Sequence, residues 1–188
     1  VQVWYRVGSR NELPGKTGLS HMLEHMMFKG TKRFGPEEYS RIIARQGGNE
    51  NAFTSADATT YFAKLASDRL DILLELEADR MRGLSLRSDQ FEPERQVVAE
   101  ERRMRVDDDP VSYLRESLTA TAFATHPYRQ PVIGWAPGIE NWTLEDLQAH
   151  YDQFYQPGNA VVVAVGDFDP EVLAERIEHF FGDIPAGP

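Results

Sequence analysis

Residues 18–30 read Gly-Leu-Ser-His-Met-Leu-Glu-His-Met-Met-Phe-Lys-Gly, an apolar pattern bounded by a glycine at each end. Such a pattern predicts a short helix. His21 and His25 are four residues apart, so a helix places both imidazoles on one face, where they can bind one metal ion. Glu24 is turned from His25 by about 100°, which suits a general base acting on a metal-activated water. The alternative is that the two histidines only cap the helix or line a core.

A catalytic zinc ion usually has three protein ligands and one open position, so the two histidines need a third partner. The chain contains no cysteine, which leaves histidine or carboxylate as the ligand. His126, His150 and His179 lie in or near predicted elements that offer no second ligand-like partner. Each is better explained as an ordinary surface or core residue, so carboxylates are the better candidates.

The predicted helix 89–106 supplies the candidate carboxylates. Glu101 shares a helical face with Val97, Val98 and Met104, so we expect it to point toward the apolar interior. A buried carboxylate is costly unless it is paired or bound to a metal. Glu101 is therefore the predicted third ligand.

Two other acids of this helix have different expected positions. Glu94 lies seven residues before Glu101, on nearly the same face, and we expect it to contact a ligand or polarise the site rather than bind the metal. Glu100 is the rival ligand, turned from Glu101 by about 100° toward Gln96 and Arg103. The remaining acids of the helix are expected to be solvated.

The composition limits the possible partners. The formal net charge is −10 and the isoelectric point is near 5.0, whereas nucleic acids and anionic membranes attract basic surfaces. No apolar run reaches the roughly 18 residues that a membrane span needs. We expect a soluble protein with no nucleic-acid partner and no membrane span, in the bacterial cytoplasm or periplasm.

The length predicts a single domain. A chain of 188 residues has room for one substantial core. It begins in an alternating strand pattern at 1–7 and ends in a loop-like segment at 183–188. Both ends look cut from a longer protein, so residues 1–188 are expected to form one domain of a larger one.

Local patterns predict the order of the elements. Alternation and turn residues predict strands at 1–7, 52–55, 59–65 and 160–165, the last of a buried type. Besides the helix around His21, helical patterns predict helices at 36–46, 67–81, 89–106, 111–124, 143–155 and 170–181. This order predicts an α+β fold in which a mixed, largely antiparallel sheet is packed with helices. The polar strand 52–55 could accept an extended peptide by strand addition, although a plain sheet edge is its commoner role.

At these motifs the sequence resembles the M16 family of zinc metallopeptidases, the group of pitrilysin and the mitochondrial processing peptidases. The family signature is an inverted zinc motif followed by a distant glutamate, here His21, Glu24, His25 and Glu101. The resemblance covers nearly the whole chain, with matching segments at 18–31, 51–55, 60–61, 94–101, 127–134 and 155–166. It implies a LuxS/MPP-like metallohydrolase lobe.

The resemblance also implies an activity. The chain would be a zinc endopeptidase lobe that hydrolyses peptides or unfolded segments, with His21, His25 and Glu101 binding Zn²⁺. Glu24 would take a proton from the metal-activated water and deliver it to the leaving amine.

Substrate and partner contacts follow from the same resemblance. The strand residues Asn51, Ala52, Phe53 and Thr54 would pair with the substrate backbone, and Asn51 would help to hold the peptide near the metal. Family enzymes close a chamber with a second, related lobe from the same chain or another subunit, which supplies an Arg and Tyr pair. Without that lobe we expect weak activity or none.

Two other functions remain as alternatives. One is a non-catalytic peptide-binding or assembly subunit, against which the complete motif counts. The other is a zinc hydrolase for a non-peptide bond, because a fold and its ligands do not fix the substrate.

Overall fold

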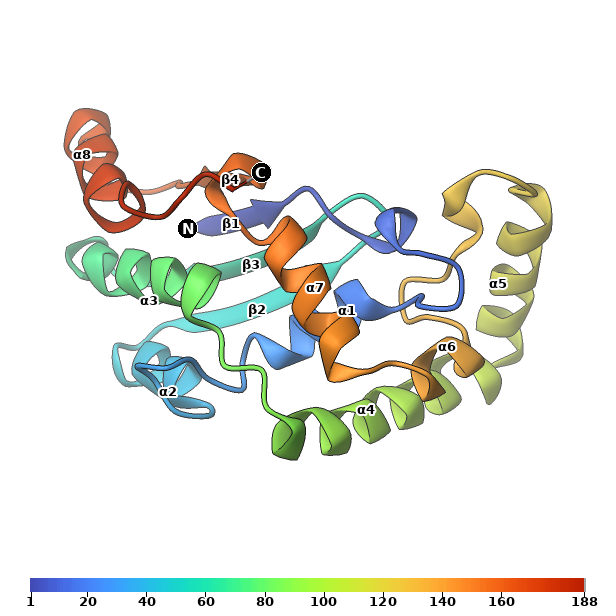
Figure 1. The fold of residues 1–188 in the computed structure, drawn as a ribbon. Coiled ribbons are helices and arrows are strands. Elements are labelled where there is room, and N and C mark those ends of the chain that lie inside the picture. Colours follow the sequence, from blue (N-terminus) through green and yellow to red (C-terminus); the bar gives the residue numbers. More distant parts are fainter. Residues whose placement is uncertain (188) are drawn as a thin grey trace.

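The computed structural model describes residues 1–187 and contains one four-stranded sheet in the order β2-β3-β1-β4 (Figure 1). The strands are β1 Gln2–Tyr5, β2 Asn49–Thr54, β3 Thr59–Lys64 and β4 Ala160–Val163. Each neighbouring pair is antiparallel, which confirms the expected α+β fold with a largely antiparallel sheet. The predicted terminal loop is described up to Gly187, and Pro188 lies outside the described residues.

Eight α-helices occur among the described residues: α1 Leu19–Met26, α2 Glu38–Arg45, α3 Leu70–Gly83, α4 Ser88–Arg102, α5 Pro110–Ala122, α6 Ala136–Glu140, α7 Leu144–Phe154 and α8 Pro170–Phe181. Side-chain caps fix three of their starts. Asp109 caps α5, Asp169 caps α8, and Thr143 forms a reciprocal capping box with Asp146 at α7. No helix of this part of the chain combines the length and the apolar character that crossing a membrane would require.

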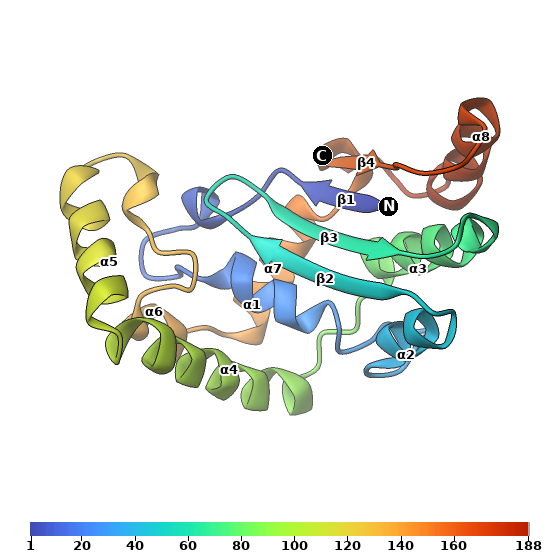
Figure 2. The same cartoon turned by 180° about the vertical axis from the view of Figure 1, so that it is seen from behind.

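The helices pack on one face of the sheet, and this packing places α1 beside the edge strand β2. Alternate strand residues such as Val3, Tyr5 and Tyr61 are fully buried against the helices. Figure 2 looks onto the other face, which none of the described helices covers. The exposed Phe53 lies on that face, where its ring packs edge-on against Trp4 with centroids 5.6 Å apart. The sheet thus separates a packed side from an open side, and β2 lies at one border.

Strand β4 differs from the prediction of a buried strand. Within residues 1–187 it pairs with β1 alone and forms the sheet edge opposite β2. Its side chains alternate between partial burial and exposure, and Val161 and Val163 are 41% and 37% exposed. A continuous apolar run is typical of a strand covered on both faces, but here only one face meets a helix layer.

The end of α4 also differs from the prediction of a regular helix to Val106. The α-helix ends at Arg102, and a π-helical turn follows over Arg103–Asp107. Val97 and Met104, which we expected to face the interior with Glu101, are 50% and 66% exposed. Only Val98 of the three apolar neighbours is buried, so the apolar-face argument for Glu101 was wrong in part.

Candidate metal centre

Helix α1 presents its two histidines on the side opposite its core residues. Met22, Leu23 and Met26 are fully buried, so the polar face of the helix is left toward α4. The His21 and His25 rings lie with centroids 4.7 Å apart. The predicted helix therefore does bring both imidazoles to one place.

A buried glutamate holds the N-terminus of α1. The helix begins after Gly18, which has no side chain to cap it. Glu12 accepts hydrogen bonds from the backbone N–H groups of Gly18 and Ser20, at 2.6 and 2.7 Å, and so satisfies donors that have no partner within the helix. Burial raises the pKa of Glu12 to about 7, although these hydrogen bonds act in the opposite direction. The sequence analysis missed this residue, and the absence of a capping side chain at Gly18 was the one available signal.

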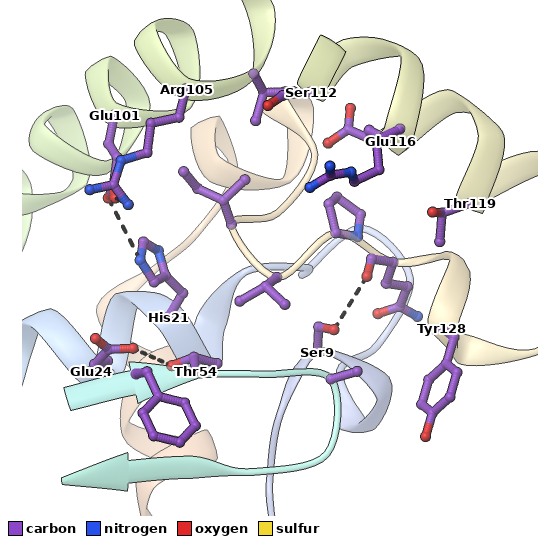
Figure 3. Close-up of a pocket in the computed structure, with 18 of the residues that line it drawn as sticks. Ser9, His21, Glu24, Thr54, Glu101, Arg105, Ser112, Glu116, Thr119 and Tyr128 are labelled. Atoms are coloured by element: carbon purple, nitrogen blue, oxygen red, sulfur yellow. Dashed lines mark hydrogen bonds and ion pairs between the residues drawn. The ribbon is translucent and has the colours of Figure 1, made fainter. Parts of the chain in front are cut away.

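Glu101 lies next to both histidines. Its Oε2 atom is 3.6 Å from His21 Nε2 and 3.4 Å from His25 Nε2, as the left part of Figure 3 shows for His21. Two ligands of a tetrahedral zinc ion at 2.0–2.1 Å are about 3.4 Å apart, so this separation fits a metal between them. The neighbouring Glu100 instead points outward and binds Arg103 at 2.9 Å.

The polar atoms of this group fit a cation. Glu101 Oε2 is buried and has no hydrogen-bond partner among the described residues, and leaving such an atom unpaired is costly. Burial, followed by the charges of His25 and Arg105, lowers the pKa of His21 to about 3, so its imidazole is neutral near pH 7. A neutral imidazole is the form that binds zinc. Two histidines and one carboxylate form a donor set that suits Zn²⁺.

The other oxygen of Glu101 has a separate partner. Arg105 Nη1 lies 2.7 Å from Glu101 Oε1. The arginine therefore leaves Oε2 directed at the imidazoles, and it does not compete for that atom.

Glu94 supports His25 from behind. Its Oε1 lies 2.8 Å from His25 Nδ1, and its Oε2 lies 2.6 Å from Lys29 Nζ. The hydrogen bond with His25, together with Lys29, lowers the pKa of Glu94 despite partial burial. A carboxylate on Nδ1 fixes the tautomer in which Nε2 has its lone pair free for a metal.

Glu24 lies beside the three-residue group without belonging to it. Thr54 Oγ1 donates a hydrogen bond to Glu24 Oε2 (Figure 3). Burial raises the pKa of Glu24, and the hydrogen bond from Thr54 partly offsets this rise. The carboxylate borders the same cavity as His21 and Glu101, which is where a general base for a metal-activated water is needed.

That cavity has a volume of about 590 Å³ and lies between the β2–β3 hairpin and α5. Ala52, Phe53 and Thr54 line it, whereas Asn51 is not among the residues that line it within the described chain. Asn51 Oδ1 instead accepts a hydrogen bond from the backbone N–H of Ala52 at 2.8 Å. Asn51 shares a strand face with Phe53, but it lies two residues farther from the hairpin end that the cavity borders.

The remaining histidines lie in other surroundings. His150 Nε2 is 3.1 Å from Ser20 Oγ in the core, His126 accepts a hydrogen bond from the Tyr128 backbone, and His179 packs edge-on against Phe180. None of them joins the cluster of His21, His25 and Glu101, which is the one group of possible metal ligands found within residues 1–187.

Comparison with known proteins assigns the family. Residues 1–135 match the family model described as Insulinase (Peptidase family M16), and residues 141–188 match that of the Peptidase M16 inactive domain. The chain belongs to the M16 peptidase family, which confirms the resemblance found in the sequence.

Named relatives include zinc proteases. The chain is 47% identical over 181 residues to zinc protease PqqE of Helicobacter pylori, covering 96% of the chain and 41% of that relative. A crystal structure of a protease from Helicobacter pylori matches with a TM-score of 0.95 at 45% identity, covering 100% of the chain and 45% of that protein. The periplasmic protease PqqL from Escherichia coli shares the fold, with a TM-score of 0.88 at 24% identity over 100% of the chain and 21% of its own length. The chain spans about two-fifths of the length of the curated relatives it matches.

Proposed function

We propose that this chain is the catalytic lobe of a zinc-dependent endopeptidase, and that His21, His25 and Glu101 are its metal ligands. The observation that supports this most is the convergence of two Nε2 atoms and one carboxylate oxygen at 3.4–3.6 Å. Zinc proteases among the relatives support the choice of metal.

Each polar residue of the site has a task in this proposal. Bound zinc would supply Lewis-acid chemistry, lowering the pKa of a water molecule and polarising the peptide carbonyl. Glu24 takes the proton from the attacking water and returns it to the leaving amine. Thr54 holds the Glu24 carboxylate in place, and Glu94 holds the His25 ring.

The free edge of β2 is the proposed binding surface for the peptide backbone. Ser55 N–H donates to Ala58 O at 2.8 Å across the hairpin turn. Hydrogen-bonded and non-hydrogen-bonded pairs alternate along an antiparallel ladder, so the next hydrogen-bonded pair is Phe53 with Thr60. The backbone groups of Ala52 and Thr54 then face away from β3, toward the open edge. An extended peptide can add there as a fifth antiparallel strand, provided that Asn51 releases the N–H of Ala52.

A second lobe would complete the enzyme. The open face of the sheet and the short span of the chain relative to its family members both fit a lobe that encloses the substrate. The proposal treats residues 1–188 as one domain of that assembly, in which the second lobe would supply the Arg and Tyr pair that the family resemblance implies.

Hydrolysis by the complete protein tests the proposal. Chelation should abolish cleavage of a fluorogenic peptide, and added Zn²⁺ should restore it. Glu24→Gln should remove cleavage while zinc content stays unchanged, and the exposed Glu140→Gln should leave both unchanged. Undiminished activity of Glu24→Gln would contradict the mechanism. Wild-type protein that contains no zinc after gentle purification would favour a non-catalytic binding subunit.

A further inference from the structure

We propose that the cavity beside the metal centre selects an acidic side chain on the N-terminal side of the scissile bond, and that Arg115 and Arg129 recognise its carboxylate. This inference rests on the proposed peptidase function and names the substrate class for it. Both arginines line the cavity of about 590 Å³, Arg115 from α5 and Arg129 from the loop after it.

The direction of strand pairing places the N-terminal part of the substrate in this cavity. Strand β2 runs from Asn49 toward Thr54 and leads into the hairpin turn. A peptide that pairs antiparallel to β2 therefore has its N-terminal residues at the hairpin end. The cavity lies at that end, because Thr54 and Ala56 line it, and Glu24 beside Thr54 marks the position of the scissile bond.

Helix α5 turns a polar face toward the cavity. Ser112, Glu116 and Thr119 line it together with Arg115, at helical spacing (Figure 3). The apolar residues Val111, Leu114 and Leu118 of the same helix are all more than 60% exposed. The α5 side of the cavity is therefore polar and can receive a charged ligand group, whereas other parts of the lining, such as Val106, Val132 and Ile133, are apolar.

The two acids of α5 and its start that lie near this wall each have a partner. Both oxygens of Glu116 accept hydrogen bonds from Arg102, at 2.8 and 2.9 Å. Asp109, at the start of α5, caps that helix by accepting from Val111 N–H and Ser112 N–H. The charge of Glu116 is therefore balanced by Arg102. Asp109 keeps its charge at the helix start, where hydrogen bonds from Ser112, and to a smaller extent Arg115, lower its pKa.

The two arginines lack such partners. Within residues 1–187 neither Arg115 nor Arg129 forms an ion pair, and Arg129 donates only to the carbonyl of Ala124 at 3.2 Å. A planar guanidinium binds a carboxylate through two parallel hydrogen bonds, so a glutamate or aspartate of the substrate is the matching ligand.

Matched peptides test the inference on the complete zinc-loaded protein. One cleavable sequence is made with Glu, Gln or Lys at each residue before the cleavage site in turn. At the position that reaches the arginines, Glu should raise kcat/KM about fivefold over Lys, the size of a moderately exposed ion pair. Arg115→Glu should invert this preference and Arg129→Gln should weaken it. Arg41→Glu is the matched control, because Arg41 is an exposed helical arginine without an ion pair in the described chain, outside the cavity.

Binding separates this inference from the peptidase function itself. The affinity of the Glu24→Gln protein for the same labelled peptides is measured by fluorescence anisotropy, which needs no turnover. Tighter binding of the Glu peptide without cleavage by wild type would support the cavity assignment and contradict the proposed function. Cleavage with equal rates and affinities for Glu and Lys peptides would overturn the cavity assignment and leave the function standing. An Arg115→Glu variant that keeps the wild-type preference would also overturn it.

Discussion

The Glu94 carboxylate lies 2.8 Å from His25 Nδ1. It therefore orients the imidazole of a proposed metal ligand without itself belonging to the ligand group. Replacing Glu94 with Gln weakens this contact and removes the charge, so we expect zinc affinity to fall by about 10–100-fold. Chelator competition measures the change. Glu92→Gln, an exposed position on the same helix, should leave the affinity unchanged, and equal affinities for all three proteins would show that Glu94 has no role at the metal.

Two adjacent glutamates should respond differently to the same substitution. Glu101→Gln removes a proposed ligand. Zinc affinity should therefore fall by more than the roughly 100-fold that can follow the loss of a residue which only orients a ligand. Glu100→Gln removes only a surface ion pair with Arg103 and should have no effect on zinc affinity. The reverse pattern would identify Glu100 as the ligand and would contradict the geometry of α4.

The Thr54 hydroxyl should affect turnover rather than metal binding. Thr54→Val keeps the shape of the side chain but removes the donor to Glu24. We expect kcat to fall by about fivefold, the equivalent of one hydrogen bond, with zinc content and KM unchanged. Thr54→Ser retains a hydroxyl and should recover most of the rate, and a Ser variant as slow as the Val variant would point to a packing defect instead.

Glu12 should give the protein a distinctive pH dependence of stability. Its pKa in the folded state is about 7, above the ordinary value of 4.5, so the folded protein binds this proton more tightly than the unfolded chain does. The stability linked to Glu12 is complete below pH 4.5 and is lost as the pH rises through 7, by up to about 1.4 kcal/mol per pH unit.

Comparison with Glu12→Gln isolates this effect, because glutamine does not titrate. Urea unfolding of both metal-free proteins at several pH values gives the two free energies of unfolding. Their difference, wild type minus variant, should decrease between pH 4.5 and 7 and then become constant. A difference that is flat over this range would show that Glu12 has an ordinary pKa.

Helical spacing predicted that His21 and His25 share one face, whereas the position of Glu101 beside them depends on the packing of α1 against α4. The four-residue separation of His21 and His25 requires only that the segment be a helix, and Glu101 could be separated from Glu100 by a rotation of about 100°. The supporting argument from Val97 and Met104 failed, because an outer helix face beside a cleft can keep apolar residues in solvent. The Glu101 side chain nevertheless points toward the histidines, on the side of α4 where Val98 is buried.

Other features depend on contacts that sequence patterns do not encode. Glu12 reaches α1 across a loop, and no periodicity relates it to Ser20. The exposed face of β4 depends on the absence of any described helix from that side of the sheet, which is set by the packing of the whole sheet rather than by the apolar residues of β4. The pairing of Arg102 with Glu116, which leaves Arg115 unpaired, likewise requires the turn between α4 and α5.

The central claim is that His21, His25 and Glu101 hold one zinc ion, and anomalous diffraction at the zinc edge from crystals of the zinc-loaded protein tests it most directly. The account predicts a single strong peak with both Nε2 atoms and one oxygen of Glu101 at about 2.0–2.2 Å. A peak elsewhere, or a zinc ion bound without Glu101, would contradict it.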